Sequence, residues 1–111
     1  MTHKTFRHTH RVTYAECTVG NHVYYARYLD FIEAARGEFF RSLGEPLEKL
    51  QQTGVIFPVF ECRLGYRAAA RYDDVLHVDV WVREISRVRL VFACRITRAS
   101  DGELVLDAET T

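Results

Sequence analysis

The first stretch of the chain alternates between two kinds of side chain from residue 6 to residue 14. One phase holds Phe6, His8, His10, Val12 and Tyr14. The other phase holds only arginine and threonine, and this period of two predicts a β-strand with one covered face. Polar residues interrupt the alternation over 15–23, where we expect a loop.

The period changes over residues 24–43, where apolar side chains recur at spacings of three and four. The repeating positions are Tyr28, Ile32, Ala35, Phe39 and Leu43. Such spacing predicts one long amphipathic helix. Further apolar residues widen the stripe, namely Leu29, Phe31 and Phe40. We therefore expect this helix to be buried on most sides. Gly44 and Pro46 should end it, and a short helical turn is expected over 46–52.

The remainder of the chain returns to a period of two. Strands are expected over 55–67, 75–85, 87–97 and 103–110, with a hairpin turn at 99–102. Consecutive strands joined by short turns favour an antiparallel meander. One face of that sheet must be covered by the long helix, because the sequence holds no other element that can cover it.

These elements predict an α+β fold of the hotdog type. In this arrangement an antiparallel sheet of about five strands wraps around one long helix, here at about 24–43. The length suits a single domain over 1–111. One helix leaves apolar strand positions uncovered, so we expect a homodimer or a homotetramer to cover them.

Charge and cysteine content exclude several classes of function. The 15 basic and 15 acidic side chains cancel, so bulk charge recruits neither nucleic acid nor an anionic membrane. Cys17, Cys62 and Cys94 form no paired motif, which argues against a disulfide framework and a zinc site. Cys62 and Cys94 fall on inward strand positions and are expected to be buried thiols. Without an apolar signal core or an apolar run of about 20 residues, the sequence predicts a cytoplasmic protein with no membrane span.

A recognisable motif spans the predicted loop and the start of the helix. Residues 14–24 read Tyr-Ala-Glu-Cys-Thr-Val-Gly-Asn-His-Val-Tyr, and Tyr28 and Arg36 follow. This run resembles the aromatic–x–Asp–x–Asp–x–x–Gly–x–Val–Tyr motif of hotdog thioesterases of the 4-hydroxybenzoyl-CoA thioesterase type. It is especially similar to acyl-CoA thioesterases encoded beside the Tol–Pal genes, whose Pro-x-Arg-x-Asp-Asp-x-Leu and Leu-Val-Phe segments resemble residues 69–76 and 90–92. The resemblance implies hydrolysis of the thioester of an acyl-CoA or an acyl carrier protein, without a cofactor.

The chain departs from that motif at the catalytic position. The second Asp of the family is its catalytic carboxylate, and the matching residue is Thr18, whose hydroxyl is no general base at pH 7. Glu16 matches the first acid, and Asn21 stands where the family usually has Gly. Some hotdog thioesterases of enediyne biosynthesis also lack the acid, and a helix tyrosine and arginine are implicated there. Tyr28 and Arg36 match these two, so loss of the Asp is compatible with hydrolysis.

Backbone donors at the helix start are the first catalytic candidates. The backbone N–H groups near Tyr24 and Tyr25 are expected to lie in the first turn of the helix. The resemblance implies that this region binds the thioester carbonyl, and preorganised N–H donors there would stabilise a developing oxyanion. The alternative is a helix start that is merely capped by water or by Asn21.

Side chains of the loop are further catalytic candidates. Thr18 and Asn21 can position water or the thioester but cannot take a proton. Glu16 would be a base if desolvated, or else the salt-bridge partner of a helix arginine. His22 would be a base near neutral pH, or else a residue that orders the loop. Cys17 would be a nucleophile only if the helix start stabilised its thiolate.

A second group of residues is expected to bind substrate. These are Tyr24, Tyr28, Arg36, Arg71, Arg87 and Arg89. The resemblance implies that basic residues near strand ends bind the CoA phosphates across a subunit interface, and the last three arginines fit this. A solvated strand edge is the alternative. Arg36 lies on an apolar helix and needs a partner, which Glu16 or Glu33 would supply.

Two other functions are also compatible with the sequence. Thr18 also suits a non-catalytic hotdog protein that binds a thioester without turnover. A hotdog dehydratase would use His22 and Glu33, but the Gly-His-Phe-Pro-type motif of such enzymes is absent. The N-terminal histidines have no accompanying carboxylate, so no metal site is predicted.

Overall fold

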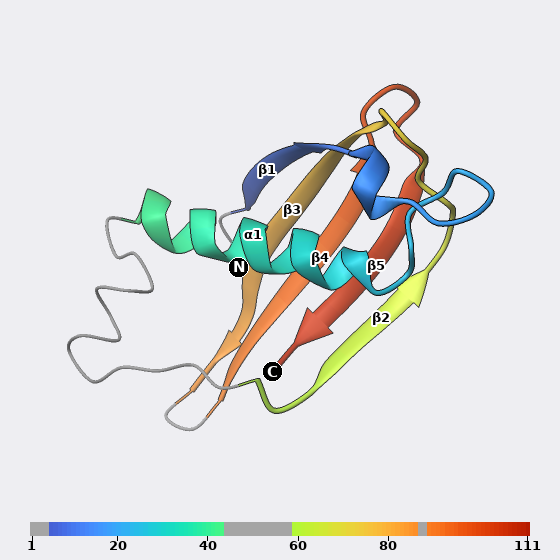
Figure 1. Ribbon diagram of the computed structural model, residues 1–111. Coiled ribbons are helices and arrows are strands. Elements are labelled where there is room, and N and C mark those ends of the chain that lie inside the picture. The colour runs from blue at the N-terminus through green and yellow to red at the C-terminus, as the bar shows by residue number, and fades with distance from the viewer. Residues whose placement is uncertain (1–4, 44–58, 87–88) are drawn as a thin grey trace.

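The computed structural model describes residues 5–43, 59–86 and 89–111. The elements follow in the order β1 (Phe6–Arg11), the 3₁₀ turn η1 (Tyr14–Glu16), α1 (Arg27–Ser42), β2 (Cys62–Tyr66), β3 (Val75–Ile85), β4 (Leu90–Arg98) and β5 (Leu104–Thr110), as Figure 1 shows. The predicted helical turn at 46–52 lies outside the described residues, as does the first part of the strand expected at 55–67. None of the helices in the described ranges is long and apolar enough to cross a membrane.

All five strands pair antiparallel in one sheet, in the order β1-β3-β4-β5-β2. Only β3, β4 and β5 form the meander that the sequence predicts. The prediction was wrong for β2, which pairs with β5 at the far edge of the sheet and not with β3 (Figure 1). Alternation along a strand determines which face is buried, but it does not determine the neighbour.

The connection between β2 and β3, residues 67–74, crosses the end of the sheet. We call it the crossing segment. At its start, the Arg67 N–H donates to the Val105 carbonyl at 2.8 Å. At its end, the Val12 N–H donates to the Asp74 carbonyl at 2.8 Å. The crossing segment thereby runs from β5 to the end of β1.

Helix α1 lies across one face of the sheet, as predicted (Figure 1). Its buried residues are Tyr28, Phe31, Ile32, Ala35, Arg36, Phe39 and Phe40. The apolar members pack with sheet residues such as Leu76, Val78 and Ile96 in one core. Burying one large apolar side chain stabilises a fold by about 1.5–3 kcal/mol, so this face holds the helix on the sheet. The prediction of a helix buried on most sides was wrong, because only seven of the 16 residues of α1 are buried and Leu29 is exposed.

The first strand ends earlier than the alternation predicts. β1 stops at Arg11, and the chain then turns into η1. Val12 still lies in the core, but Tyr14 is 77% exposed. The 3₁₀ turn is the reason, because the Glu16 N–H donates to the Thr13 carbonyl at 3.1 Å and rotates the chain out of the strand.

Candidate active site

Residues 17–23 form a short hairpin before α1. Cys17 pairs with Val23, and both side chains pack toward the core. The Thr18 N–H donates to the His22 carbonyl at 2.9 Å, which makes these two residues the next pair along the hairpin. Because side chains alternate between the two faces of a strand, Thr18 and His22 lie on the face away from the core.

The tip of this hairpin depends on a left-handed backbone at Gly20 and Asn21, whose φ angles are 95° and 63°. A Cβ at residue 20 would lie 3.2 Å from the His22 ring, so glycine permits the turn and leaves room for the imidazole. The Asn21 N–H donates to the Thr18 carbonyl at 3.1 Å. Asn21 therefore belongs to the hairpin turn, and the N-cap of α1 is Ala26 instead.

The crossing segment lies beside the hairpin. The Val23 N–H donates to the Ala70 carbonyl at 2.9 Å, and Arg71 pairs with His22. Residues directly opposite each other in paired strands have Cβ atoms about 4.5–5.5 Å apart. The structure thus brings three predicted site residues, Thr18, His22 and Arg71, into one row across the hairpin and the crossing segment.

The start of α1 differs from the prediction. The Tyr24 N–H donates to the Glu16 carbonyl at 3.0 Å, and the Arg27 N–H donates to the Tyr24 carbonyl at 2.8 Å. Residues 24–26 therefore form a turn, and the helix begins three residues later than expected. The Tyr24 N–H is already occupied. No hydrogen-bond acceptor is found within the described residues for the N–H groups of Tyr25 and Ala26, so these two are available to a ligand.

Glu16 is engaged through its side chain as well as its backbone. Its Oε1 accepts the Thr13 N–H at 2.8 Å and lies 2.8 Å from Nε2 of His10. Burial raises the pKa of this carboxyl, but the hydrogen bonds from Thr13 and His10 outweigh burial and hold the pKa below its usual range. A carboxylate with a lowered pKa is a weak general base. The partner expected for Glu16, a helix arginine, is replaced by His10.

Tyrosines surround the helix start. Tyr25 is 61% exposed, and its carbonyl accepts the Tyr66 hydroxyl at 3.1 Å. Tyr28 is buried, and its hydroxyl accepts the Ala70 N–H at 3.2 Å. Burial raises the pKa of Tyr28, so it stays a neutral hydroxyl near pH 7. Tyr28 thus ties α1 to the crossing segment, whereas Tyr66 of β2 joins the site without having been predicted.

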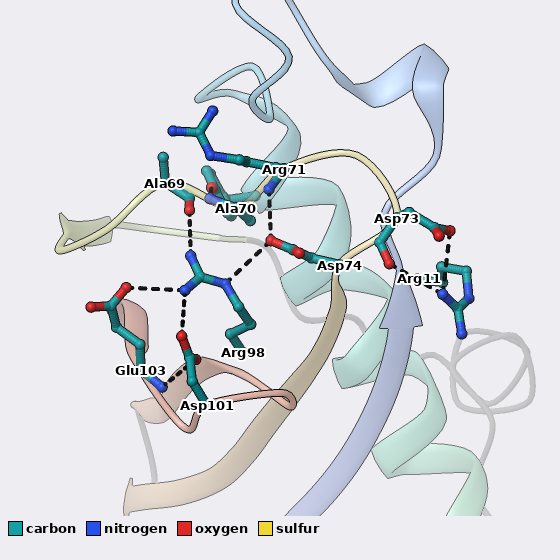
Figure 2. A network of polar contacts seen from close by, with 10 residues as sticks. Arg11, Ala69, Ala70, Arg71, Asp73, Asp74, Arg98, Asp101 and Glu103 are labelled. Carbon is teal, nitrogen blue, oxygen red and sulfur yellow. Dashed lines mark hydrogen bonds and ion pairs between the residues drawn. The ribbon is translucent and has the colours of Figure 1, made fainter.

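Arg98, near the end of β4, fastens the crossing segment to the sheet (Figure 2). Its guanidinium donates to the Ala69 carbonyl at 2.7 Å and to the Asp74 carboxylate at 3.2 Å. The same group donates to Asp101 at 2.9 Å and to Glu103 at 3.1 Å in the turn between β4 and β5. This contact was not predicted either, because no local pattern links residue 98 to the segment before β3.

Two other predicted substrate-binding arginines, Arg36 and Arg89, lie apart from the hairpin. Arg36 is 7% exposed, pairs with Glu33 at 3.3 Å and has its guanidinium carbon 5.5 Å from the centre of the Phe92 ring. It lies about 13 Å along α1 from the first helical residue. Arg89 directly precedes β4 and therefore lies at the Ile85 end of β3, whereas the crossing segment and the hairpin lie at the Val75 end. Arg87 lies outside the described residues.

The thiols take no part in this arrangement. All three cysteines are free. Burial raises the pKa of Cys94 to about 12, which confirms the predicted buried thiol, whereas Cys62 is only half-buried. Cys17 donates its S–H to the Thr13 carbonyl at 3.6 Å. In the part of the chain that the structure describes, no three His, Cys, Asp or Glu side chains form a group that could hold a metal ion.

Comparison with known proteins identifies the family. The profile of the thioesterase-like superfamily matches residues 12–111. The chain belongs to this superfamily. The hotdog fold is confirmed by the crystal structure of a hypothetical protein from Thermus thermophilus, which superposes with a TM-score of 0.91 at 33% identity, over 96% of this chain and 80% of that chain.

The relatives of this chain include proteins whose names describe an activity. The acyl-CoA thioesterase YbgC of Haemophilus influenzae is 36% identical over 89 residues, which cover 79% of this chain and 65% of that protein. The acyl-CoA thioester hydrolase YbgC of Escherichia coli O6:H1 is 35% identical over 104 residues, which cover 94% of this chain and 77% of that protein. The chain thus spans slightly less than two thirds of the first relative and about three quarters of the second.

Proposed function

We propose that this protein hydrolyses the thioester of an acyl-CoA or an acyl carrier protein. The names of its relatives support the reaction class. The main structural support for the proposed site is the N–H group of Tyr25. It has no hydrogen-bond acceptor among the described residues and lies just before α1. A preorganised N–H near the positive end of a helix is the donor that a thioester carbonyl needs as its oxygen gains charge.

His22 is the general base in this proposal. Its ring lies against Gly20, and within the described ranges no hydrogen bond occupies it, in contrast to the carboxylate of Glu16. The imidazole takes a proton from water as the water oxygen bonds to the thioester carbon. The tetrahedral intermediate then breaks its carbon–sulfur bond, and the departing thiolate receives that proton from His22.

Neighbouring residues would orient the reactants. Thr18 lies next to His22 in the row, and its hydroxyl would hold the attacking water together with the Asn21 amide. Arg71, at the other side of His22, would bind a phosphate of CoA or of a phosphopantetheine arm. Tyr24, which is partly exposed, would flank the acyl group.

Assembly into a homodimer or a homotetramer is part of the proposal. β2 is an edge strand. Phe60, just before it, and Tyr66, its last residue, are exposed at 83% and 49%. An unpaired edge with exposed aromatic residues favours pairing with another chain. Arg87 and Arg89 would then bind the phosphates of CoA across the interface, as the resemblance implies, whereas the buried Arg36 would stay within its own subunit. Sedimentation at micromolar concentration tests this, and a monomer would contradict it.

A cytoplasmic location is also part of the proposal. The three cysteines are free thiols, as is usual for proteins in the reducing environment of the cytoplasm.

The decisive experiment measures thiol release from a panel of acyl-CoAs and acyl carrier proteins. Loss of a general base typically slows a reaction by about 10²–10⁴-fold, so His22→Gln should lower kcat by at least two orders of magnitude. His77→Gln is the matched control, because His77 is a half-buried histidine of β3 outside the site. Equal rates for the two variants would remove His22 from the mechanism.

Binding without turnover is the second candidate function. It is supported by Thr18, which the resemblance places where the family has its catalytic Asp. It predicts that calorimetry detects binding of an acyl-CoA while no thiol is released. A Thr18→Asp variant that gains hydrolysis would favour this alternative.

A further inference from the structure

His10 lies on β1, outside the loop motif, and joins three elements that meet at the helix start. Its Nε2 lies 2.8 Å from Oε1 of Glu16 in η1. Its ring centre lies 4.5 Å from that of Phe31 in α1. The His10 and Glu16 side chains are 24% and 20% exposed, so little water competes with their contact. A single side chain therefore connects β1, η1 and α1.

Glu16 transmits this contact to the backbone of the helix start. Its Oε1 also accepts the Thr13 N–H at 2.8 Å, which closes η1. Its carbonyl accepts the Tyr24 N–H at 3.0 Å. The next N–H along the chain is that of Tyr25, which has no acceptor among the described residues. The Tyr24 and Tyr25 N–H groups belong to adjacent peptide units that are joined at the Cα of Tyr24. A shift of Glu16 would therefore also displace the Tyr25 N–H.

We propose that His10 is a positioning residue for thioester hydrolysis, which fixes Glu16 and, through the Tyr24 N–H, the direction of the Tyr25 N–H. This inference rests on the proposed function of the Tyr25 N–H. It gives Glu16 a positioning role as well, in place of proton transfer. Position matters because an oxyanion donor must lie about 2.7–3.1 Å from the developing charge, and a misplacement of about 1 Å costs on the order of 100-fold in rate.

Kinetics of a matched set of variants test the inference. His10→Ala should lower kcat by roughly 10- to 100-fold with little change in KM, because binding of the ground state is unaffected. His10→Gln keeps a donor near the position of Nε2 and should recover much of that loss. His8→Ala is the control, since His8 lies two residues away in the same phase of β1. It should leave kcat unchanged.

Variants of Glu16 separate positioning from proton transfer. Glu16→Ala should lose at least as much activity as His10→Ala, because it also removes the acceptor of the Thr13 N–H. The double variant should lose no more than Glu16→Ala alone, because the contact with His10 is already absent there. Glu16→Gln keeps an acceptor for Thr13 and should lose far less than Glu16→Ala. Equal losses in the two Glu16 variants would assign the proton transfer to Glu16 and overturn the inference.

Amide hydrogen exchange measured by NMR gives a readout that does not depend on turnover. The Tyr24 N–H should exchange slowly and the Tyr25 N–H quickly in the unmodified protein. His10→Ala should speed exchange at Tyr24 while exchange in β4 stays unchanged. Unchanged exchange at Tyr24, or a kcat of His10→Ala equal to that of His8→Ala, would overturn the inference. If the unmodified protein releases no thiol, the proposed function fails, whereas exchange still decides whether His10 holds the helix start.

Discussion

Replacing Arg98 with alanine should destabilise the fold by releasing the crossing segment. The Arg98 side chain is 16% exposed and donates to the Ala69 carbonyl and the Asp74 carboxylate. A hydrogen bond to a charged group contributes about 1.5–3 kcal/mol net. The ion pairs of Arg98 with Asp101 and Glu103, which are more exposed, add only about 0–1 kcal/mol each. Asp74 keeps another donor, the Arg71 N–H at 2.9 Å. We therefore expect the free energy of unfolding to fall by about 2–3 kcal/mol.

Urea unfolding followed by the fluorescence of Trp81 measures this loss. Protein concentration must be the same for all variants, because self-association would add to the measured stability. Arg63→Ala is the matched control. Arg63 is 76% exposed and pairs with Glu61 at 3.0 Å, so its loss should cost about 0–1 kcal/mol. If Arg98→Ala costs no more than Arg63→Ala, Arg98 does not hold the crossing segment.

Other contacts of the site make separate predictions. The pKa of Glu16 is lowered in the folded protein, so its carboxylate stabilises the fold above its unfolded pKa, and this contribution is lost as the pH falls through its folded pKa. The urea stabilities of the unmodified protein and Glu16→Gln should therefore converge in acid, and a constant difference would contradict the contact. Tyr28→Phe leaves the Ala70 N–H without its acceptor and should cost about 1–3 kcal/mol in the same assay; no measurable cost would refute that role. Gly20→Ala puts a Cβ on a left-handed backbone 3.2 Å from the His22 ring, and the strain of about 1–3 kcal/mol should lower Tm, whereas an unchanged Tm would show that the hairpin tip adapts.

Strand and helix periods predicted most elements well, because each period reflects which face a segment buries. The strand predicted over 75–85 is confirmed as β3, with the same bounds. The helix start was misplaced because the tyrosines before Arg27 continue the apolar pattern of the helix. Their backbone conformation depends instead on the bond from the Tyr24 N–H to Glu16, which lies eight residues back. The spacing of apolar residues along the chain gives no information about such a contact.

The geometry of the candidate site was anticipated in part, for a related reason. The motif pointed to residues 14–24, and the structure pairs two of its candidates, Thr18 and His22, in the hairpin. Arg71 was selected from a family segment, and the structure pairs it with His22. His10 was not among the predicted site residues, because a strand followed by a 3₁₀ turn brings it to Glu16 and the sequence predicted a longer strand. Tyr66 was missed because the edge position of β2 depends on strand order, which alternation does not determine.

Hydrolysis with His22 as the base is tested by thiol release from acyl-CoAs, measured side by side at neutral pH for the unmodified protein and for His22→Gln. The unmodified protein should hydrolyse at least one acyl-CoA of the panel well above the uncatalysed rate. His22→Gln should lose about 10²-fold or more in kcat while it still binds the substrate. Thiol release by the unmodified protein no faster than in buffer, for every acyl chain and aryl group, would contradict the proposed hydrolysis.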